Sequence, residues 1–202
     1  STRLRVALAE GVSSWQVYKA LSEIKFLTGK LENIPDEGTI APASYDFVIG
    51  MTKEALIKKM QERQASILNE AWNARQPNLP INTKQEALIL ASIIEKETSL
   101  KTERGKVSSV FVNRLLREIA LQTDASVVYG ITRGKKVLGR GLRRSELKKD
   151  TPWNTYVNKG LPPSPIGNPG KASIHAALNP DITNYLYFVA DGSGGHAFAE
   201  NL

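Results

Sequence analysis

TKQEALILASIIEKETS, Thr83 to Ser99, predicts a helix that carries a run of large apolar residues and ends in two glutamates. Thr83 and Glu86 have the spacing of a capping box, in which each side chain accepts a hydrogen bond from an exposed N–H group at the helix start. The two glutamates, Glu95 and Glu97, follow the apolar run directly. Their positions around the helix decide whether either carboxylate is a candidate for chemistry.

Because an α-helix advances about 100° per residue, positions on this helix can be compared by angle. With Ala87 at zero, the large apolar residues from Ile89 to Ile94 average about 270°, and Glu97 falls at about 280°. Glu95 falls at about 80°, on the opposite side. Glu97 therefore continues the apolar stripe, whereas Glu95 is interpreted as a surface charge that is dispensable.

The two positions predict different chemistry for the two carboxylates. Loss of solvent penalises an ionised carboxylate, so we expect the pKa of Glu97 to be raised. A carboxylic acid that stays protonated near neutral pH is the general acid that cleavage of a glycosidic bond requires. A structural role remains open at this point, since Glu97 could instead contact an arginine or the start of the next helix.

The chain before this helix predicts a small mixed region. Leu4 to Gly11 alternates apolar and polar residues and predicts a strand, and Ser13 or Ser14 can cap the helix that follows. The prolines, glycine and small residues from Pro35 to Phe47 predict a loop or a short extended piece. A second helix is expected from Thr52 up to the QPNLP segment that begins at Gln76.

The chain after it predicts further helices and then less regular structure. A helix from Thr102 carries an apolar residue at every fourth position from Val107 to Ile119. From Gln122 to Gly170 we expect turns, short strands and a basic stretch, with no regular structure in GLPPSPIGNPG. A short helix over Ser173–Leu178 and a buried strand over Leu186–Ala190 complete an α+β fold.

Composition limits the classes of function. The 202 residues are 41% hydrophobic and 23% charged, which is typical of a soluble globular protein, and the net charge of +7 suits anionic partners. The absence of cysteine excludes disulfide scaffolds and thiolate metal sites, and two histidines make a histidine-rich metal centre an unfavourable interpretation. No apolar run reaches the roughly 18 residues of a membrane-spanning helix. Because the chain starts with Ser1 and not Met, we interpret it as a trimmed piece.

Five segments in a fixed order resemble a known family. They are LASIIEKET, ERGKVSSVFVNRL, LQTDASVVYG, NTYVNKGLPPSPIGNPG and YLYFVADGSGGHAF, beginning at Leu90, Glu103, Leu121, Asn154 and Tyr185. Together they resemble the YceG-like family of endolytic murein transglycosylases, over nearly the whole chain. EGTIAPASYDF, from Glu37, is similar to a further family element. One departure is Ala125-Ser126, where the family usually has Pro-Thr.

The resemblance implies a fold and a reaction. The second glutamate of its EKE triplet, here Glu97, is the catalytic residue, and Thr98 takes the place of a serine found in other lytic transglycosylases. The substrate is the peptidoglycan glycan strand, cleaved between N-acetylmuramic acid and N-acetylglucosamine with formation of a 1,6-anhydro ring, and no metal or organic cofactor is needed. The implied architecture is a lysozyme-like helical catalytic region over residues 35–202, after the remainder of an N-terminal accessory (LysM-like) module over residues 1–34.

The resemblance also implies a cellular setting. A single membrane-anchoring helix upstream would hold the catalytic region on the outer, periplasmic face of the cytoplasmic membrane. The expected protein partners are the peptidoglycan synthases, penicillin-binding proteins, of the growing cell wall.

Several polar residues are candidates for binding the sugar. They share amide, hydroxyl, carboxyl or imidazole groups that suit sugar hydroxyls and acetamido groups. The candidates are Gln122, Thr123, Asp124, Tyr129, Asn154, Tyr156, Asn168 and His196. For Asp124 a turn or cap role is an equal alternative, and for the tyrosines and His196 the alternative is burial with a local hydrogen bond.

Three other functions remain open. A muramidase would use Glu97 and Asp124 as its two carboxylates and add water. A nucleic-acid-binding module would use the basic stretch Arg133–Lys149, although that stretch lacks interleaved aromatic residues and a recognition helix, so we expect no nucleic acid partner. The third is a wall-binding protein without catalytic activity.

Overall fold

The computed structural model describes residues 3–202 and contains seven helices and four strands in that range. In chain order the elements are β1 (Arg3–Ala7), α1 (Ser14–Ser22), β2 (Ser44–Val48), α2 (Lys53–Asn73), α3 (Lys84–Glu97), α4 (Arg104–Leu116), α5 (Asp124–Thr132), α6 (Arg144–Lys148), α7 (Lys171–Leu178), β3 (Tyr187–Ala190) and β4 (His196–Ala199). The strands form two separate antiparallel pairs, β1–β2 and β3–β4. The α+β class predicted from the sequence is confirmed.

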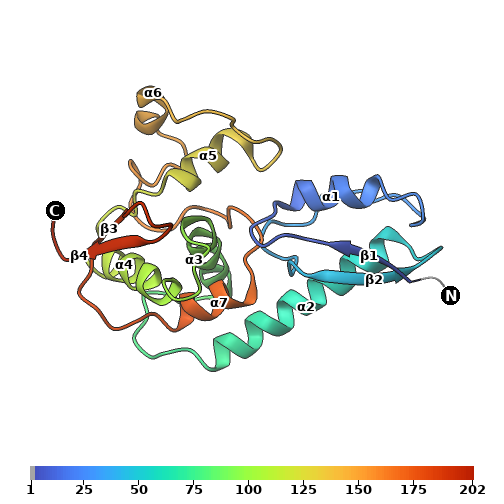
Figure 1. Cartoon of the computed structure of the whole chain (residues 1–202), viewed down its shortest axis with the longest axis horizontal. Helices are drawn as coiled ribbons and strands as arrows, with labels where there is room; N and C mark the ends of the chain where they lie inside the picture. The colour runs from blue at the N-terminus through green and yellow to red at the C-terminus, as the bar shows by residue number, and fades with distance from the viewer. Residues whose placement is uncertain (1–2) are drawn as a thin grey trace.

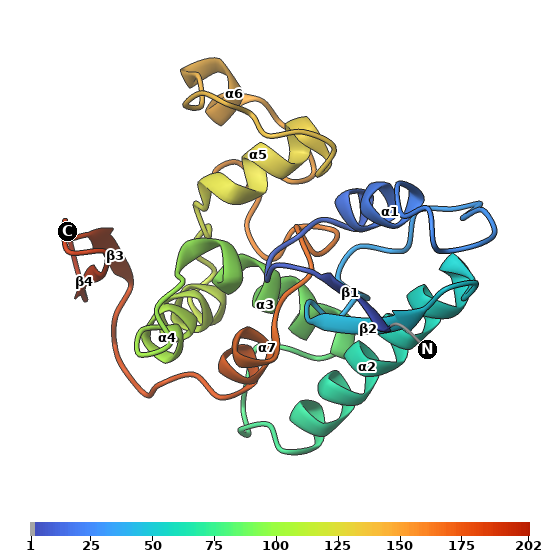
Figure 2. The same cartoon turned by 45° about the vertical axis from the view of Figure 1, so that its right-hand side comes forward.

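Helix α3 lies in the middle of the molecule, with α4 and α7 beside it (Figures 1 and 2). Every residue from Ala87 to Ile94 is buried, so α3 has no solvent-facing side over these two turns. At its start the Thr83 hydroxyl accepts a hydrogen bond from the Glu86 N–H group, as predicted. The Glu86 carboxylate, however, accepts from the Asn82 N–H group instead of that of Thr83, so the predicted capping box is only half formed.

The main core surrounds α3. It includes residues from the end of α2, from α3, α4 and α7, and from the segment that contains Ile166. In α4, Val107 and Phe111 of the predicted stripe are buried. The helix ends at Leu116, before Ile119, because Glu118 takes a left-handed conformation (φ 55°) that cannot continue it.

A second, smaller core lies at the N-terminal end. It contains ten buried residues, which are Val17, Leu21, Leu27, Leu31, Ile40, Tyr45, Phe47, Leu56, Ile57 and Met60. The β1–β2 pair and α1 cover it together with the first half of α2, at one end of the molecule in Figure 1. This core includes residues on both sides of position 34, and α2 runs from it into the main core.

The segment from Gln122 to Gly170 differs from its prediction. It forms two helices, α5 and α6, and contains no strand among the described residues. The proline-rich part from Gly160 to Gly170 has no helix or strand, as predicted. Strand β3 is found as expected, but it is not buried, since 63% of Val189 is exposed.

Across residues 3–202, no helix combines the length and apolarity needed to cross a membrane.

Candidate active site

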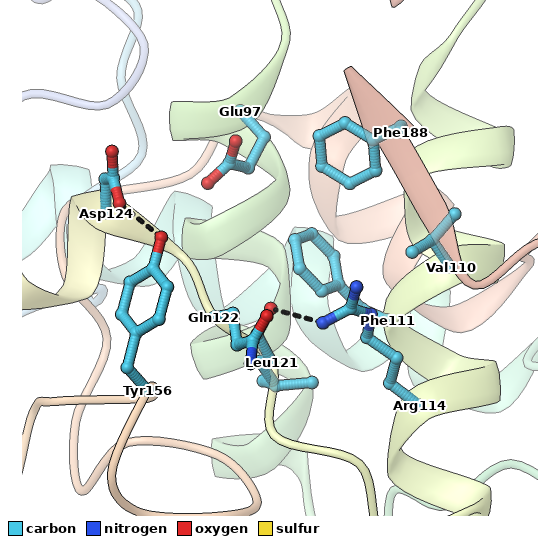
Figure 3. Close-up of a pocket in the computed structure, with 9 residues that line it drawn as sticks. All are labelled: Glu97, Val110, Phe111, Arg114, Leu121, Gln122, Asp124, Tyr156 and Phe188. Atoms are coloured by element: carbon cyan, nitrogen blue, oxygen red, sulfur yellow. Dashed lines mark hydrogen bonds between the residues drawn. The ribbon is translucent and has the colours of Figure 1, made fainter. Parts of the chain in front are cut away.

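A cavity of about 210 Å³ opens at the C-terminal end of α3 (Figure 3). Its lining comes from α3, α4, β3, the start of α5 and the segment after α6. The lining residues are Glu97, Val110, Phe111, Arg114, Leu121, Gln122, Asp124, Tyr156 and Phe188. One side is therefore apolar and aromatic, and the other side carries carboxyl, amide and phenol groups.

Glu97 is the last residue of α3 and points into this cavity. Its Oε1 atom accepts a hydrogen bond of 2.5 Å from the Thr123 hydroxyl. Burial raises the pKa of Glu97 above its ordinary value, and the nearby Asp124 charge raises it further, while the Thr123 hydrogen bond and the charge of His196 lower it. The predicted direction of the Glu97 pKa shift is confirmed.

Thr123 reaches Glu97 because its hydroxyl does not cap the helix that it precedes. It stands at the N-cap position of α5, where a threonine usually accepts a hydrogen bond from the helix, but here its side chain makes no cap bond. Its backbone N–H donates to the Thr155 hydroxyl at 3.0 Å, and that of Gln122 donates to the Thr155 carbonyl at 3.2 Å. These bonds hold the Gln122–Asp124 segment against the end of α3, so the three predicted residues lie together.

Asp124 and Tyr156 form a pair on the same side of the cavity (Figure 3). The Tyr156 hydroxyl donates to Asp124 Oδ1 at 2.5 Å. Burial and the Asp124 carboxylate both raise the pKa of Tyr156, so this phenol remains a hydrogen-bond donor at neutral pH. The pair comes from residues 32 positions apart that only the fold brings together.

His196 packs against a residue of the cavity wall. Its Nδ1 atom lies 2.7 Å from Glu103 Oε2, and its backbone N–H donates to Glu103 Oε1. The imidazole packs edge-to-face on Phe188, with ring centroids 5.2 Å apart, and Phe188 lines the cavity. His196 therefore approaches the site, as predicted, but is not part of the cavity lining.

Three other predicted residues do not line this cavity. Tyr129 donates its hydroxyl to Glu37 Oε2 at 2.8 Å and lines a different cavity. Asn154 is fully buried and donates to three backbone carbonyls before and after Lys148, those of Glu146, Leu147 and Lys149. Asn168 is also fully buried and bonds the N-terminal region. The predicted sugar contacts are not possible from these buried positions. The two asparagines instead form hydrogen bonds with backbone groups and stabilise the fold.

The prediction that Glu95 is a surface charge is wrong. Only 5% of its side chain is exposed, and it accepts a hydrogen bond of 2.8 Å from the Gly170 N–H group at the start of α7. Arg104 Nη2 lies 3.6 Å from its other oxygen. The side of α3 opposite the apolar stripe is thus buried as well. The Glu95 carboxylate interacts there with the Arg104 guanidinium and with the N–H group at the start of α7.

Arg114 and Phe188 line the cavity and were missed in the sequence. Arg114 Nε donates to the Leu186 carbonyl at 2.7 Å and Nη1 to the Ala120 carbonyl at 2.9 Å, which ties α4 to β3 and to the chain before Gln122. Burial lowers the pKa of Arg114. Its position three residues after Phe111 was a usable signal, but a charged residue is not expected on a core-facing side.

No group of three or more histidine, aspartate or glutamate side chains is placed to hold a metal ion in the part of the chain that the structure describes.

Comparisons with known proteins identify relatives of this chain. The chain is 34% identical over 219 aligned residues to the endolytic murein transglycosylase of Bacillus subtilis, a match that covers 100% of this chain and 59% of that protein. It is 33% identical to the protein of the same name from Streptococcus pneumoniae serotype 2, over 82% of this chain and 30% of the relative. A crystal structure of a YceG-like protein from Listeria monocytogenes superposes with a TM-score of 0.77 at 27% identity, over 98% of this chain and 73% of that one.

These curated relatives are longer than this chain, which spans at most 59% of their length. A sequence model of the YceG-like family matches residues 1–202, the whole of the chain. The chain belongs to the YceG-like family.

Proposed function

We propose that this chain is the catalytic part of an endolytic murein transglycosylase, which cleaves peptidoglycan strands between N-acetylmuramic acid and N-acetylglucosamine. The names of the relatives from Bacillus subtilis and Streptococcus pneumoniae support the substrate and the reaction class. The observation that carries the proposal is the Glu97 carboxyl group, whose pKa is raised by burial at the wall of the cavity. An acid of this kind can protonate a leaving oxygen near neutral pH.

In the proposed mechanism Glu97 acts twice. As the protonated acid it donates its proton to the glycosidic oxygen while the bond from that oxygen to the anomeric carbon breaks. As a carboxylate it then takes the proton from the 6-hydroxyl of the muramyl residue, whose oxygen bonds to the anomeric carbon and closes the 1,6-anhydro ring. Because the substrate supplies the nucleophile, a second catalytic carboxylate is not required, unlike in hydrolysis by the usual glycosidases.

The groups around Glu97 have proposed supporting roles. Thr123 orients the carboxyl group through its hydrogen bond to Oε1. Asp124, fixed by the Tyr156 hydroxyl, offers a negative charge to the cationic intermediate, and Gln122 offers an amide to the sugar. His196 contributes through Phe188 and its charge, not by direct lining of the cavity.

The larger setting is proposed from the family resemblance. The helical region around α3 would be the lysozyme-like catalytic region, within residues 35–202. The N-terminal part, from residue 1 through 34, would belong to an accessory LysM-like module whose packing extends to Met60 in the second core. Attachment to the cytoplasmic membrane, exposure at its outer face and contact with peptidoglycan synthases belong to the same proposal.

A muramidase is the second candidate. The observation that favours it is the position of Asp124, a second carboxylate that lines the same cavity as Glu97. The Tyr156 hydroxyl already occupies Asp124 Oδ1, which favours a stabilising role over the activation of water. The two candidates differ in their products.

The assignment of Glu97 is tested by digestion of purified sacculi with Glu97→Gln. We expect a loss of about 1,000-fold in the rate of strand cleavage, because the amide cannot donate or accept the proton. Glu62→Gln, at an exposed glutamate on α2, is the matched control and should keep full activity. Digestion by Glu97→Gln at the unmodified rate would mean that another group is the catalyst.

A further inference from the structure

The positive charge of this protein is concentrated in one segment. Arg133–Lys149 contains eight basic residues and one acidic residue, so its formal charge of +7 equals that of the whole chain. The other 185 residues are therefore neutral in sum. The segment follows α5 and includes α6, and these two helices lie above α3 in the view of Figure 1.

Part of this charge is used within the fold. Arg140 pairs with Glu146 at 2.7 Å, and the Arg133 guanidinium stacks 3.6 Å from the centre of the Trp153 ring. Lys136 has no ion pair among residues 3–202, and its side chain lines a cavity of about 330 Å³. A basic residue with this placement is available to a ligand.

The cavity has an apolar wall and two lysines, of which Lys96 also lies near the carboxylates of Glu37 and Glu95. Its lining residues are Gln16, Lys96, Ala125, Val128, Tyr129, Thr132, Gly134, Lys136, Val137, Leu138 and Ile166. Lys96 is held in place by a hydrogen bond of 2.7 Å from Nζ to the Gly11 carbonyl, and the Ser13 hydroxyl bonds the Gly134 carbonyl at 2.6 Å. The cavity is thus closed on one side by the start of α1 and on the other by α5.

This cavity adjoins the candidate active site through two pairs of neighbouring residues. Lys96 lines this cavity and Glu97 lines the active-site cavity, at the end of α3. Ala125 lines this cavity and Asp124 lines the other, at the start of α5. Both cavities therefore lie at the end of α3 and the start of α5.

A short apolar chain that ends in a carboxylate fits this lining, because its aliphatic part can cover Val128 and Ile166 while the carboxylate meets the ammonium groups. Each muramyl residue of a peptidoglycan strand carries such a chain, a stem peptide that begins with a small apolar residue and bears carboxylates. We propose that the cavity between α5 and α1 binds the stem peptide of the muramyl residue at the cleavage site, with Lys136 and Lys96 contacting its carboxylates. This site rests on the proposed function, since it selects the substrate of the same reaction.

An anionic membrane surface is a different partner for basic residues, and the geometry favours the peptide. The lining on α5 and at Ile166 is buried or half-buried, and a planar surface would reach only the exposed side chains at the rim, which are Gln16, Lys96, Lys136 and Val137. The Val137 side chain is 82% exposed at this rim, so the entrance of the cavity is open to an extended chain.

The test compares Lys136→Glu with Lys135→Glu, two adjacent exposed lysines of which only Lys136 lines the cavity. Both variants change the net charge equally, so long-range attraction is matched. The substrates are glycan strands with intact stem peptides and the same strands after an amidase has removed the peptides. We expect Lys136→Glu to lower kcat/KM about fivefold on peptide-bearing strands, which corresponds to about 1 kcal/mol, relative to Lys135→Glu. On denuded strands the two variants should be equal.

Three results would overturn the stem-peptide site. The first is equal activity of the two variants on peptide-bearing strands, and the second is an equal loss for Lys136→Glu on both substrates. The third is weaker binding of Lys136→Glu to vesicles of phosphatidylglycerol, with cleavage of both substrates unchanged. Failure of the proposed function has a different signature, which is full activity of Glu97→Gln on both kinds of strand.

Discussion

The hydroxyl of Thr123 lowers the proton affinity of Glu97 in this structure. It donates to Glu97 Oε1, which favours the ionised form and lowers the pKa of Glu97 against the larger effect of burial. Thr123→Val removes the donor, so the pKa of Glu97 should rise further. Since a general acid is lost as pH rises through its pKa, the alkaline limb of kcat/KM against pH should move to higher pH. Loss of the orienting bond should also lower kcat about tenfold.

The matched variant for this position is Thr123→Ser, which keeps the hydroxyl and should keep both the pH profile and the rate. The measurement is kcat/KM on soluble glycan strands across the pH range. An alkaline limb that stays in place in Thr123→Val, or moves to lower pH, would show that this hydrogen bond does not control Glu97.

At the scale of the elements, Glu95 joins three helices. Its carboxylate on α3 binds the Gly170 N–H group at the start of α7 and lies beside Arg104 at the start of α4. Glu95→Ala leaves Arg104 buried without this partner, and loss of one member of a buried pair costs about 3 kcal/mol or more. Urea unfolding should therefore give a free energy of unfolding lower by about 3 kcal/mol.

Glu62→Ala is the control for this prediction, since Glu62 pairs with Lys58 at 4.0 Å on the exposed side of α2. Its cost should be about 0.5 kcal/mol or less. Equal costs for the two variants would mean that the Glu95 contacts do not stabilise the protein.

Helix α3 also shows which elements could be predicted from the sequence. Its start at Thr83 and its apolar run are local signals, and the structure contains both. The helical wheel places Glu97 toward the interior correctly, but it assumes that the opposite side faces solvent, and from Ala87 to Ile94 the helix α3 is buried on all sides. The environment of Glu95 depends on α4 and α7, which are distant in sequence. Helix α5 was not predicted, and at its start the Thr123 hydroxyl bonds Glu97 instead of capping the helix.

At the scale of the whole molecule, Asn168 links the N-terminal region to the proline-rich segment before α7. Its Oδ1 accepts from the Ile40 N–H group at 3.0 Å, and its Nδ2 donates to the Val12 carbonyl at 2.9 Å. Asn168→Ala leaves the buried Ile40 N–H group unpaired and removes one of the two hydrogen bonds to the Val12 carbonyl, which should lower the free energy of unfolding by about 2 kcal/mol. In hydrogen exchange, amides of the second core around Ile40 should lose more protection than those of α3.

Asn158→Ala is the comparison, because the Asn158 amide bonds Asp150 and Thr151 in an exposed position. This substitution should change the free energy of unfolding by no more than about 0.5 kcal/mol. It should leave the hydrogen exchange of amides in the second core unchanged. Uniform loss of protection in Asn168→Ala, equal in both cores, would contradict the proposed link.

The two cores themselves could not be located from sequence patterns alone. The second core includes the first half of α2, and this helix of 21 residues continues without a break into the main core. No linker-like stretch of sequence therefore marks the boundary between the two cores. The cavity side chains Glu97, Asp124 and Tyr156 come from three separate segments. The resemblance to a family supplied the order of these segments, whereas the pairing of Tyr156 with Asp124 required the fold.

We propose that Glu97 serves a reaction in which the substrate, not water, supplies the nucleophile. The most direct measurement is mass spectrometry of the new glycan ends after digestion of peptidoglycan strands in isotopically labelled water. We expect 1,6-anhydromuramyl ends that contain no label, and we expect these ends to disappear in Glu97→Gln. Reducing muramyl ends that carry the labelled oxygen would contradict it, and would assign Glu97 and Asp124 to hydrolysis.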